Sequence, residues 1–201
     1  MDQRHKVTRR EGLKSALLLG LAVNLGLAAD RAKAQATSGR GAVLVAYFTR
    51  TGNTRVIAHQ IKRALDADLF EVQPAQPYPE DYEETVAQAT REREAGFKPP
   101  LAADVPNIQL YDTVFLGFPI WGMSVPPVIR SFLSNHDLSG KTLVPFITHG
   151  GYGLGNSLQI VAEDAPQARL LESFSLEADQ ERRTLEQVTG WLGALDVSVP
   201  R

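Results

Sequence analysis

The sequence contains no cysteine among its 201 residues. This absence excludes disulfide bonds, thiol catalysis, zinc sites made of thiolates, and a lipid anchor attached to a cysteine. The sequence also lacks a large excess of one charge, because it contains 21 Lys and Arg residues and 23 Asp and Glu residues, which give a formal net charge of −2. Nothing in this balance points to nucleic acid. The hydrophobic share of 43% is that of one globular domain with a core.

A long apolar run is also missing, and the apolar stretch near the N-terminus is typical of an export signal. Residues 1–14 are basic, and residues 15–29 then form an apolar run that is shorter than the ~20 residues that a membrane-spanning helix needs. Small residues follow, spaced for cleavage after Ala34 or Ala36. We therefore expect residues 1–36 to be an export signal peptide; the alternative is an anchoring or amphipathic N-terminal helix.

This signal resembles the twin-arginine type. Arg9 and Arg10 form the pair in TRREGLK, and the match departs at Gly12, where that type usually has a large apolar residue. Removal of the signal would leave residues 37–201 with 14 basic and 20 acidic residues. We expect this remainder to be one acidic domain, periplasmic or otherwise exported, with no stable membrane span after signal cleavage.

Apolar and amphipathic segments alternate along residues 37–201. Continuous apolar runs, as in strands buried on both faces, predict strands over 42–48, 112–120 and 141–150, and further strands are predicted over 68–74, which a proline ends, and 168–176. Helical spacing predicts helices over 54–65, 79–96, 125–136, 153–166 and 179–195, the second of which is polar and lies on the surface. Five β-α units predict an α/β fold, a three-layer sandwich with a five-stranded parallel sheet between two layers of helices.

Ligands of such a sheet bind beyond the carboxyl ends of its strands, where the winding reverses. With the strand order 2-1-3-4-5, the loops after the first, third and fourth strands meet at one crevice. The first of these loops, residues 49–54, reads TRTGNT and leads directly into a helix. Free N–H groups at a helix N-terminus, together with threonine hydroxyls, suit a phosphate. The alternative is a helix cap by Thr51 or Asn53.

The other two loops carry aromatic residues and glycines. PIWGMSV places Trp121 and Gly122 after the third strand, and THGGYGLG places Tyr152 after the fourth. The two rings could flank a flat ligand; the alternatives are a tryptophan packed on the sheet edge and a plain glycine loop. The glycine spacing is not that of a dinucleotide fingerprint, and His149 alone favours a structural hydrogen bond over catalysis.

These loops resemble those of the flavodoxins, over about residues 41–196 and in the short-chain form. The motif T-x-T-G-N-T, the pair Trp121-Gly122 and the loop with glycines and a tyrosine carry the resemblance. It implies flavin mononucleotide (FMN) as the cofactor, with its phosphate in the threonine loop, Trp121 on one face of the ring and Tyr152 near the other face or the edge. The residues implied for FMN binding are Thr49, Arg50, Thr51, Gly52, Asn53, Thr54, Pro119, Ile120, Trp121, Gly122, Thr148, His149, Gly150, Gly151, Tyr152 and Gly153.

The resemblance implies an FMN-binding electron-transfer protein with a redox protein partner of unknown identity, and we expect a monomer. The export signal predicts that it acts outside the cytoplasm, which departs from ordinary flavodoxins, since these are cytoplasmic. It implies neither a metal site nor a catalytic residue. The alternative is an FMN-dependent NAD(P)H or quinone oxidoreductase, with His149 or Tyr152 as proton donor or substrate contact, and a flavin-free binding module is a third reading. Met123 departs from the family, which often has a polar or acidic residue there, and Arg50 and His149 place positive charge near the flavin.

Overall fold

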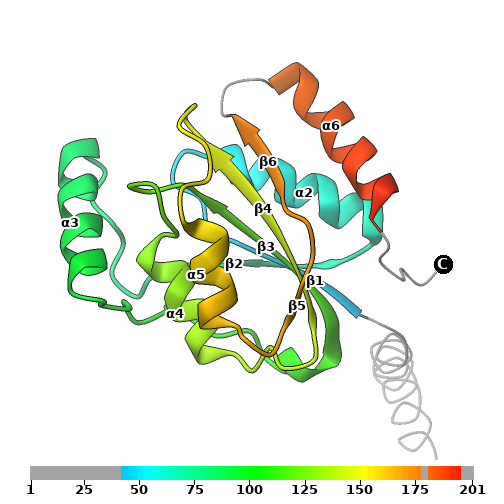
Figure 1. The fold of residues 1–201 in the computed structure, drawn as a ribbon, viewed down its shortest axis with the longest axis horizontal. Helices are drawn as coiled ribbons and strands as arrows, with labels where there is room; N and C mark the ends of the chain where they lie inside the picture. The colour runs from blue at the N-terminus through cyan, green and yellow to red at the C-terminus, as the bar shows by residue number, and fades with distance from the viewer. Residues whose placement is uncertain (1–41, 178–180, 196–201) are drawn as a thin grey trace, which may run out of the picture. The chain divides into compact units, whose positions relative to one another are not determined.

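A computed structural model of the protein describes residues 42–177 and 181–195 (Figure 1). The export signal expected over residues 1–36 lies outside the described residues. The strands are β1 (Ala42–Tyr47), β2 (Asp68–Glu71), β3 (Tyr111–Pro119), β4 (Thr142–His149), β5 (Arg169–Leu170) and β6 (Phe174–Glu177). The helices are α2 (Asn53–Leu65), α3 (Tyr82–Glu94), α4 (Pro127–Asn135), α5 (Ser157–Asp164) and α6 (Glu181–Ala194), with a short 3-10 helix, η2 (Ile108–Leu110). None of these described helices is both long and apolar enough to cross a membrane.

The sheet is parallel and follows the order β2-β1-β3-β4-β5, with β6 also paired to β4. Because β2 and β3 flank β1 on opposite sides, the winding reverses beside β1. Helices α4 and α5 cover one face of the sheet, and α2 and α6 cover the other (Figure 1). The predicted three-layer α/β fold and its strand order are confirmed.

The central strands are buried because helices cover both of their faces. In β1, Leu44 and Ala46 pack on the side of α4, whereas Val43 and Val45 pack on the side of α2. Apolar side chains are therefore needed at every position, and the sequence shows a continuous apolar run rather than an alternating one. The carboxyl ends of these rigid strands position the loops that follow them.

The fifth strand is divided into two short pieces, which differs from the single strand predicted over 168–176. Leu143 of β4 pairs with Leu170, and Phe146 of β4 pairs with Phe174. The interval from Leu143 to Phe146 in β4 therefore lies opposite the interval from Leu170 to Phe174, which is one residue longer. Insertions of this kind are common at sheet edges, where no further strand has to match the register.

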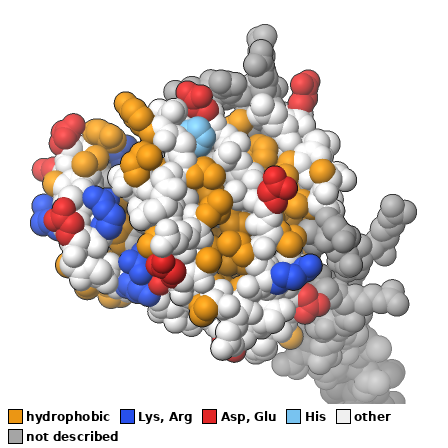
Figure 2. All heavy atoms as spheres, in the orientation of Figure 1, with side chains coloured by type: hydrophobic (Ala, Val, Ile, Leu, Met, Phe, Trp, Pro, Cys, Tyr) orange, Lys and Arg blue, Asp and Glu red, His pale blue; other side chains and the backbone are white. Residues whose placement is uncertain are grey.

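Helix α3 stands apart from the two layers that cover the sheet, at the left of Figure 1. Asp81 caps it by accepting a hydrogen bond from the Glu84 N–H at 2.9 Å, so the helix begins at Tyr82 rather than at residue 79. Figure 2 shows charged side chains of both signs over this helix, which is polar and largely exposed, as predicted. Its buried residues are Thr85, Ala89 and Glu92.

Candidate functional site

A cavity of about 310 Å³ lies at the carboxyl ends of β1, β3 and β4, and α3 forms its outer wall. The three loops singled out in the sequence meet there. The predicted residues that line it are Thr49, Arg50, Thr51, Asn53, Thr54, Pro119, Ile120, Trp121, Gly122, Thr148, His149 and Gly150. Helix α3 adds Tyr82, Thr85, Val86, Ala89, Thr90 and Arg93. The volume falls at the lower end of the ~300–1,000 Å³ typical of small-molecule sites.

Four of the predicted residues do not line this cavity: Gly52, Gly151, Tyr152 and Gly153. Gly52 has no side chain and contributes only its backbone to the threonine loop. The side chain of Tyr152 is 83% exposed, so its ring lies in solvent rather than against the cavity wall. Contact between Tyr152 and a flavin stays a prediction.

The threonine loop begins α2 without a side-chain cap. Gly52 is the N-cap residue, with φ at 96°, a left-handed conformation that glycine adopts without steric cost. Its N–H donates to Thr49 Oγ1 at 3.0 Å, and the buried hydroxyl of Thr54 shares a hydrogen bond with the Thr148 hydroxyl at 2.9 Å. The alternative of a side-chain helix cap is therefore wrong. The N–H groups of the first helical turn are available to an anion.

The cavity carries positive charge. Arg50 donates to the backbone carbonyl of Glu80 at 2.8 Å, and its guanidinium carbon lies 5.5 Å from the centroid of the Tyr82 ring. Arg93 reaches from α3 to Gly122, where its guanidinium occupies the space that a Cβ would need. None of the described residues that line the cavity is Asp or Glu. The site therefore suits an anion, and the described residues include no cluster of His, Asp or Glu that could hold a metal ion.

A tight turn after β3 presents Trp121 to the cavity. The Trp121 N–H donates to the Ser124 carbonyl at 3.0 Å, and the Ser124 N–H donates back to the Trp121 carbonyl at 3.1 Å. Gly122 and Met123 between them have φ values of 56° and 62°. A two-residue turn of this form requires left-handed residues, which glycine adopts far more easily than methionine. The turn is further held by the Asn156 N–H, which donates to the Met123 carbonyl at 3.0 Å.

The Trp121 ring is fixed by two other rings that meet it almost at right angles. The centroid of Phe48 lies 5.2 Å away at 85°, and that of Tyr78 lies 4.9 Å away at 83°. The Tyr78 hydroxyl donates to the buried Glu92 carboxylate of α3 at 2.8 Å, and the Gln88 amide donates to the same carboxylate at 2.8 Å. Burial, and then the hydrogen bond to Glu92, raise the pKa of Tyr78 well above its usual value, so Tyr78 remains a neutral donor. Helix α3 thereby positions the tryptophan.

The wall that α3 contributes was not predicted from the sequence. Polar residues dominate the segment, and they favour a solvent-facing helix. The available signal was the spacing of Thr85, Ala89 and Glu92, which lie on one helical face. A small and polar stripe of that kind cannot be told from ordinary surface without the structure, since it lacks the apolar residues that mark a buried face.

Comparison with known families matches residues 42–194 to the flavodoxins. The chain belongs to the flavodoxin family. Among solved structures, this flavodoxin-family chain is similar to a presumed flavoprotein from Bacteroides eggerthii DSM 20697, with 33% identity and a TM-score of 0.69 over 79% of this chain and 99% of that one. A presumed flavoprotein from Bacteroides uniformis ATCC 8492 is 29% identical, with a TM-score of 0.68 over 76% of this chain and 98% of that one.

A flavoprotein from Lactobacillus acidophilus NCFM, solved in complex with FMN, shares the fold with this flavodoxin-family chain. It is 19% identical, with a TM-score of 0.62 over 73% of this chain and 99% of that one. Comparison with curated proteins returns no match. The family predicted from the threonine, tryptophan and glycine loops is thus confirmed.

The turn that carries Trp121 should depend on Gly155. A Cβ on Gly155 would overlap the backbone carbonyl of Met123, whereas a Cβ on Gly153 would meet no atom within 4 Å, although both glycines have positive φ. Gly155→Ala should therefore destabilise the protein by about 1–3 kcal/mol more than Gly153→Ala, which carries only the left-handed strain. Unfolding in urea, followed by tryptophan fluorescence, measures both changes. Equal losses would show that the turn does not depend on this contact.

Proposed function

We propose that the protein binds FMN in the 310 Å³ cavity and carries electrons outside the cytoplasm. The observation that carries the proposal is the meeting of three loops around one cavity that contains two guanidinium groups and, among its described lining residues, no carboxylate. FMN joins a phosphate to a flat ring, which are the two kinds of group that an anion cradle and an aromatic wall accept. Membership of the flavodoxin family supports the same ligand.

The threonine loop would hold the phosphate. Thr51 is exposed at the cavity, so its hydroxyl and the first-turn N–H groups of α2 are free to donate to phosphate oxygens. Thr54 has a different role, because its hydroxyl is already bonded to Thr148. That bond ties the loop to the end of β4 and keeps the donors in place before a ligand arrives. Such preorganisation reduces the ordering cost of binding.

Trp121 would form one wall of the ring site. Phe48 and Tyr78 hold the indole in one orientation, so little of its freedom is left to lose on binding. FMN, when bound, supplies one-electron and two-electron redox chemistry, whose potentials the protein tunes. Arg50 and Arg93 favour electron uptake in the cavity, since positive charge nearby stabilises added negative charge.

The place of action and the partner belong to the same proposal. Residues 1–36 have the layout of a twin-arginine export signal, which supports a periplasmic or otherwise exported protein. Residues 37–201 hold 20 acidic and 14 basic residues, and an excess of negative charge attracts a basic protein partner over long range. We propose that the protein acts as a monomer that meets such a redox partner transiently.

FMN should bind the full chain more tightly than riboflavin, which has the same ring but no phosphate. Thr51→Val should reduce this preference about 10- to 100-fold, because a hydrogen bond to a charged group contributes ~1.5–3 kcal/mol. Quenching of flavin fluorescence measures both affinities. Thr142→Val is the matched control, since Thr142 lies at the amino end of β4, outside the lining of the cavity, and its replacement should leave the preference unchanged. Equal affinities for FMN and riboflavin in the unmodified protein would overturn the FMN proposal.

Stepwise reduction should distinguish the electron-carrier function from the oxidoreductase alternative. The FMN-loaded protein should take up electrons in two resolved one-electron steps, because a one-electron carrier has to hold its two potentials apart. Visible absorbance recorded after each addition of dithionite measures the steps. A single two-electron step would contradict the carrier role and favour an FMN-dependent NAD(P)H or quinone oxidoreductase.

Residues 1–40 should direct a fused, folded reporter out of the cytoplasm. Arg9→Lys together with Arg10→Lys should abolish this export, because the twin-arginine route recognises the arginine pair rather than positive charge alone. The fraction of reporter found outside the cytoplasm is the measurement. A doubly substituted signal that still exports the reporter would point to the general secretory route instead.

A further inference from the structure

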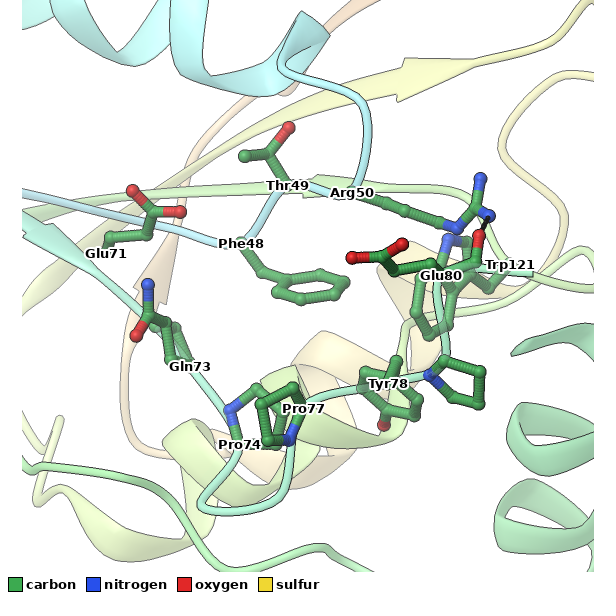
Figure 3. Close-up of a pocket in the computed structure, with 12 residues that line it drawn as sticks. Phe48, Thr49, Arg50, Glu71, Gln73, Pro74, Pro77, Tyr78, Glu80 and Trp121 are labelled. Carbon is green, nitrogen blue, oxygen red and sulfur yellow. Dashed lines mark hydrogen bonds between the residues drawn. The ribbon is translucent and has the colours of Figure 1, made fainter. Parts of the chain in front are cut away.

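A second cavity, of about 490 Å³, lies against Trp121 from the side of β2 (Figure 3). Among the described residues, the two cavities share Thr49, Arg50 and Trp121. The rest of the second lining comes from Phe48 and from parts of the segment 71–80, which leaves the sheet at the end of β2. The proposed phosphate and ring sites of FMN make no use of this space.

The walls of the second cavity are flat and apolar. In Figure 3 the ring of Phe48 projects into the middle of the space, and Pro74, Pro77 and Tyr78 lie along the opposite side. Trp121 closes the end that adjoins the first cavity. Aromatic rings and proline rings pack well against another flat ring, so these walls suit an aromatic ligand.

The charged groups that line the second cavity are the carboxylates of Glu71 and Glu80 and the guanidinium of Arg50. Glu71 is already occupied, because its carboxylate accepts hydrogen bonds from Tyr47 at 2.8 Å and from Arg55 at 2.9 Å. Burial alone would raise the pKa of Glu71, but the hydrogen bonds from Arg55 and Tyr47 together hold it below its usual value, so Glu71 is ionised. Its negative charge is balanced by Arg55.

Glu80 supplies the acceptor that a ligand could use. Figure 3 shows its carboxylate turned back across the cavity, and no described residue donates to it through a side chain. Its backbone carbonyl receives the Arg50 guanidinium, which also lies over the Tyr82 ring. A ligand hydroxyl or amine could therefore donate to Glu80, whereas a ligand carboxylate beside Glu80 would be repelled by its negative charge.

We propose that the second cavity binds a flat aromatic molecule that carries hydroxyl or amino donors and no negative charge, in contact with Trp121. The ring would lie among Phe48, Tyr78 and the prolines, and its donor would bond to Glu80. This site adjoins the proposed FMN site, shares Thr49, Arg50 and Trp121 with it, and does not require bound FMN. Since both cavities share the indole, the ligand would nevertheless alter the surroundings of a bound flavin.

The test uses the full chain without added flavin, ¹⁵N labelling, and two probes of the same ring size. 2-Naphthol should shift the signals of the Gln73 amide and the Trp121 indole N–H, with a dissociation constant of about 1 mM or lower, which is ordinary for a ligand of this size. 2-Naphthoate should bind about tenfold more weakly, because its carboxylate would lie beside that of Glu80. Naphthoate that binds as tightly as naphthol would overturn the proposal.

Variants at exposed positions locate the site without disturbing the core. Gln73→Trp should fill the cavity and weaken 2-naphthol about tenfold or more, whereas Gln76→Trp, an exposed residue of the same segment outside the lining, should have no effect. Glu80→Gln should remove most of the preference for naphthol over naphthoate. Unchanged binding in Gln73→Trp would show that naphthol binds elsewhere, and the proposal would fail.

A final titration separates this proposal from the proposed function. Saturating FMN should leave the naphthol-induced shift of Gln73 in place, because the two ligands occupy different sides of Trp121. Displacement of naphthol by FMN would overturn the proposal, since the second cavity would then be part of the flavin site. A protein that binds naphthol as expected but ignores FMN would refute the FMN proposal and leave this one standing.

Discussion

The candidate site depends on three parallel strands, each of which ends within two residues of the end of its neighbour in the ladder. Tyr47 of β1 pairs with Gly117 of β3, and Pro119 of β3 pairs with Thr148 of β4. The ladder runs one residue further, where the Ile120 N–H donates to the Thr148 carbonyl at 2.8 Å. Three loops therefore leave the sheet side by side, whatever their own sequences. A slip of one residue in this register would turn the apolar side chains of a strand to the opposite face, and the shared edge would be lost with them.

A second constraint comes from the segment between β2 and β3. Its helix, α3, belongs to neither of the layers that cover the sheet and lies against the carboxyl ends of the strands. Glu92 secures this arrangement, because a buried carboxylate is costly unless donors satisfy it, and Tyr78 and Gln88 both donate to it. The same Tyr78 supports Trp121. The position of α3 and the orientation of the tryptophan are therefore coupled through one side chain.

Much of the fold could be predicted because burial on both faces leaves a strong pattern. The continuous apolar runs around Val45 and Phe115 are sufficient to predict strands, and the loops that follow these strands predict where the crevice lies. The division of the fifth strand could not be predicted, since a one-residue insertion at an edge changes pairing but not composition. The wall formed by α3 was missed for a related reason. Thr85 and Ala89 face a cavity rather than a core, and a polar lining resembles a solvated surface.

Charge divides the surroundings of Trp121 into two unlike halves. The described lining of the first cavity holds Arg50 and Arg93 and no acidic side chain, whereas the described lining of the second holds Arg50 together with Glu71 and Glu80. A phosphate is therefore favoured more strongly in the first cavity than in the second, although the two spaces adjoin. Aromatic walls alone could not achieve this separation, because flat rings pack equally well in either cavity. The placement of charge thus supports the two proposals together: an anion on the side of Arg93 and an uncharged donor on the side of Glu80, with Trp121 between them.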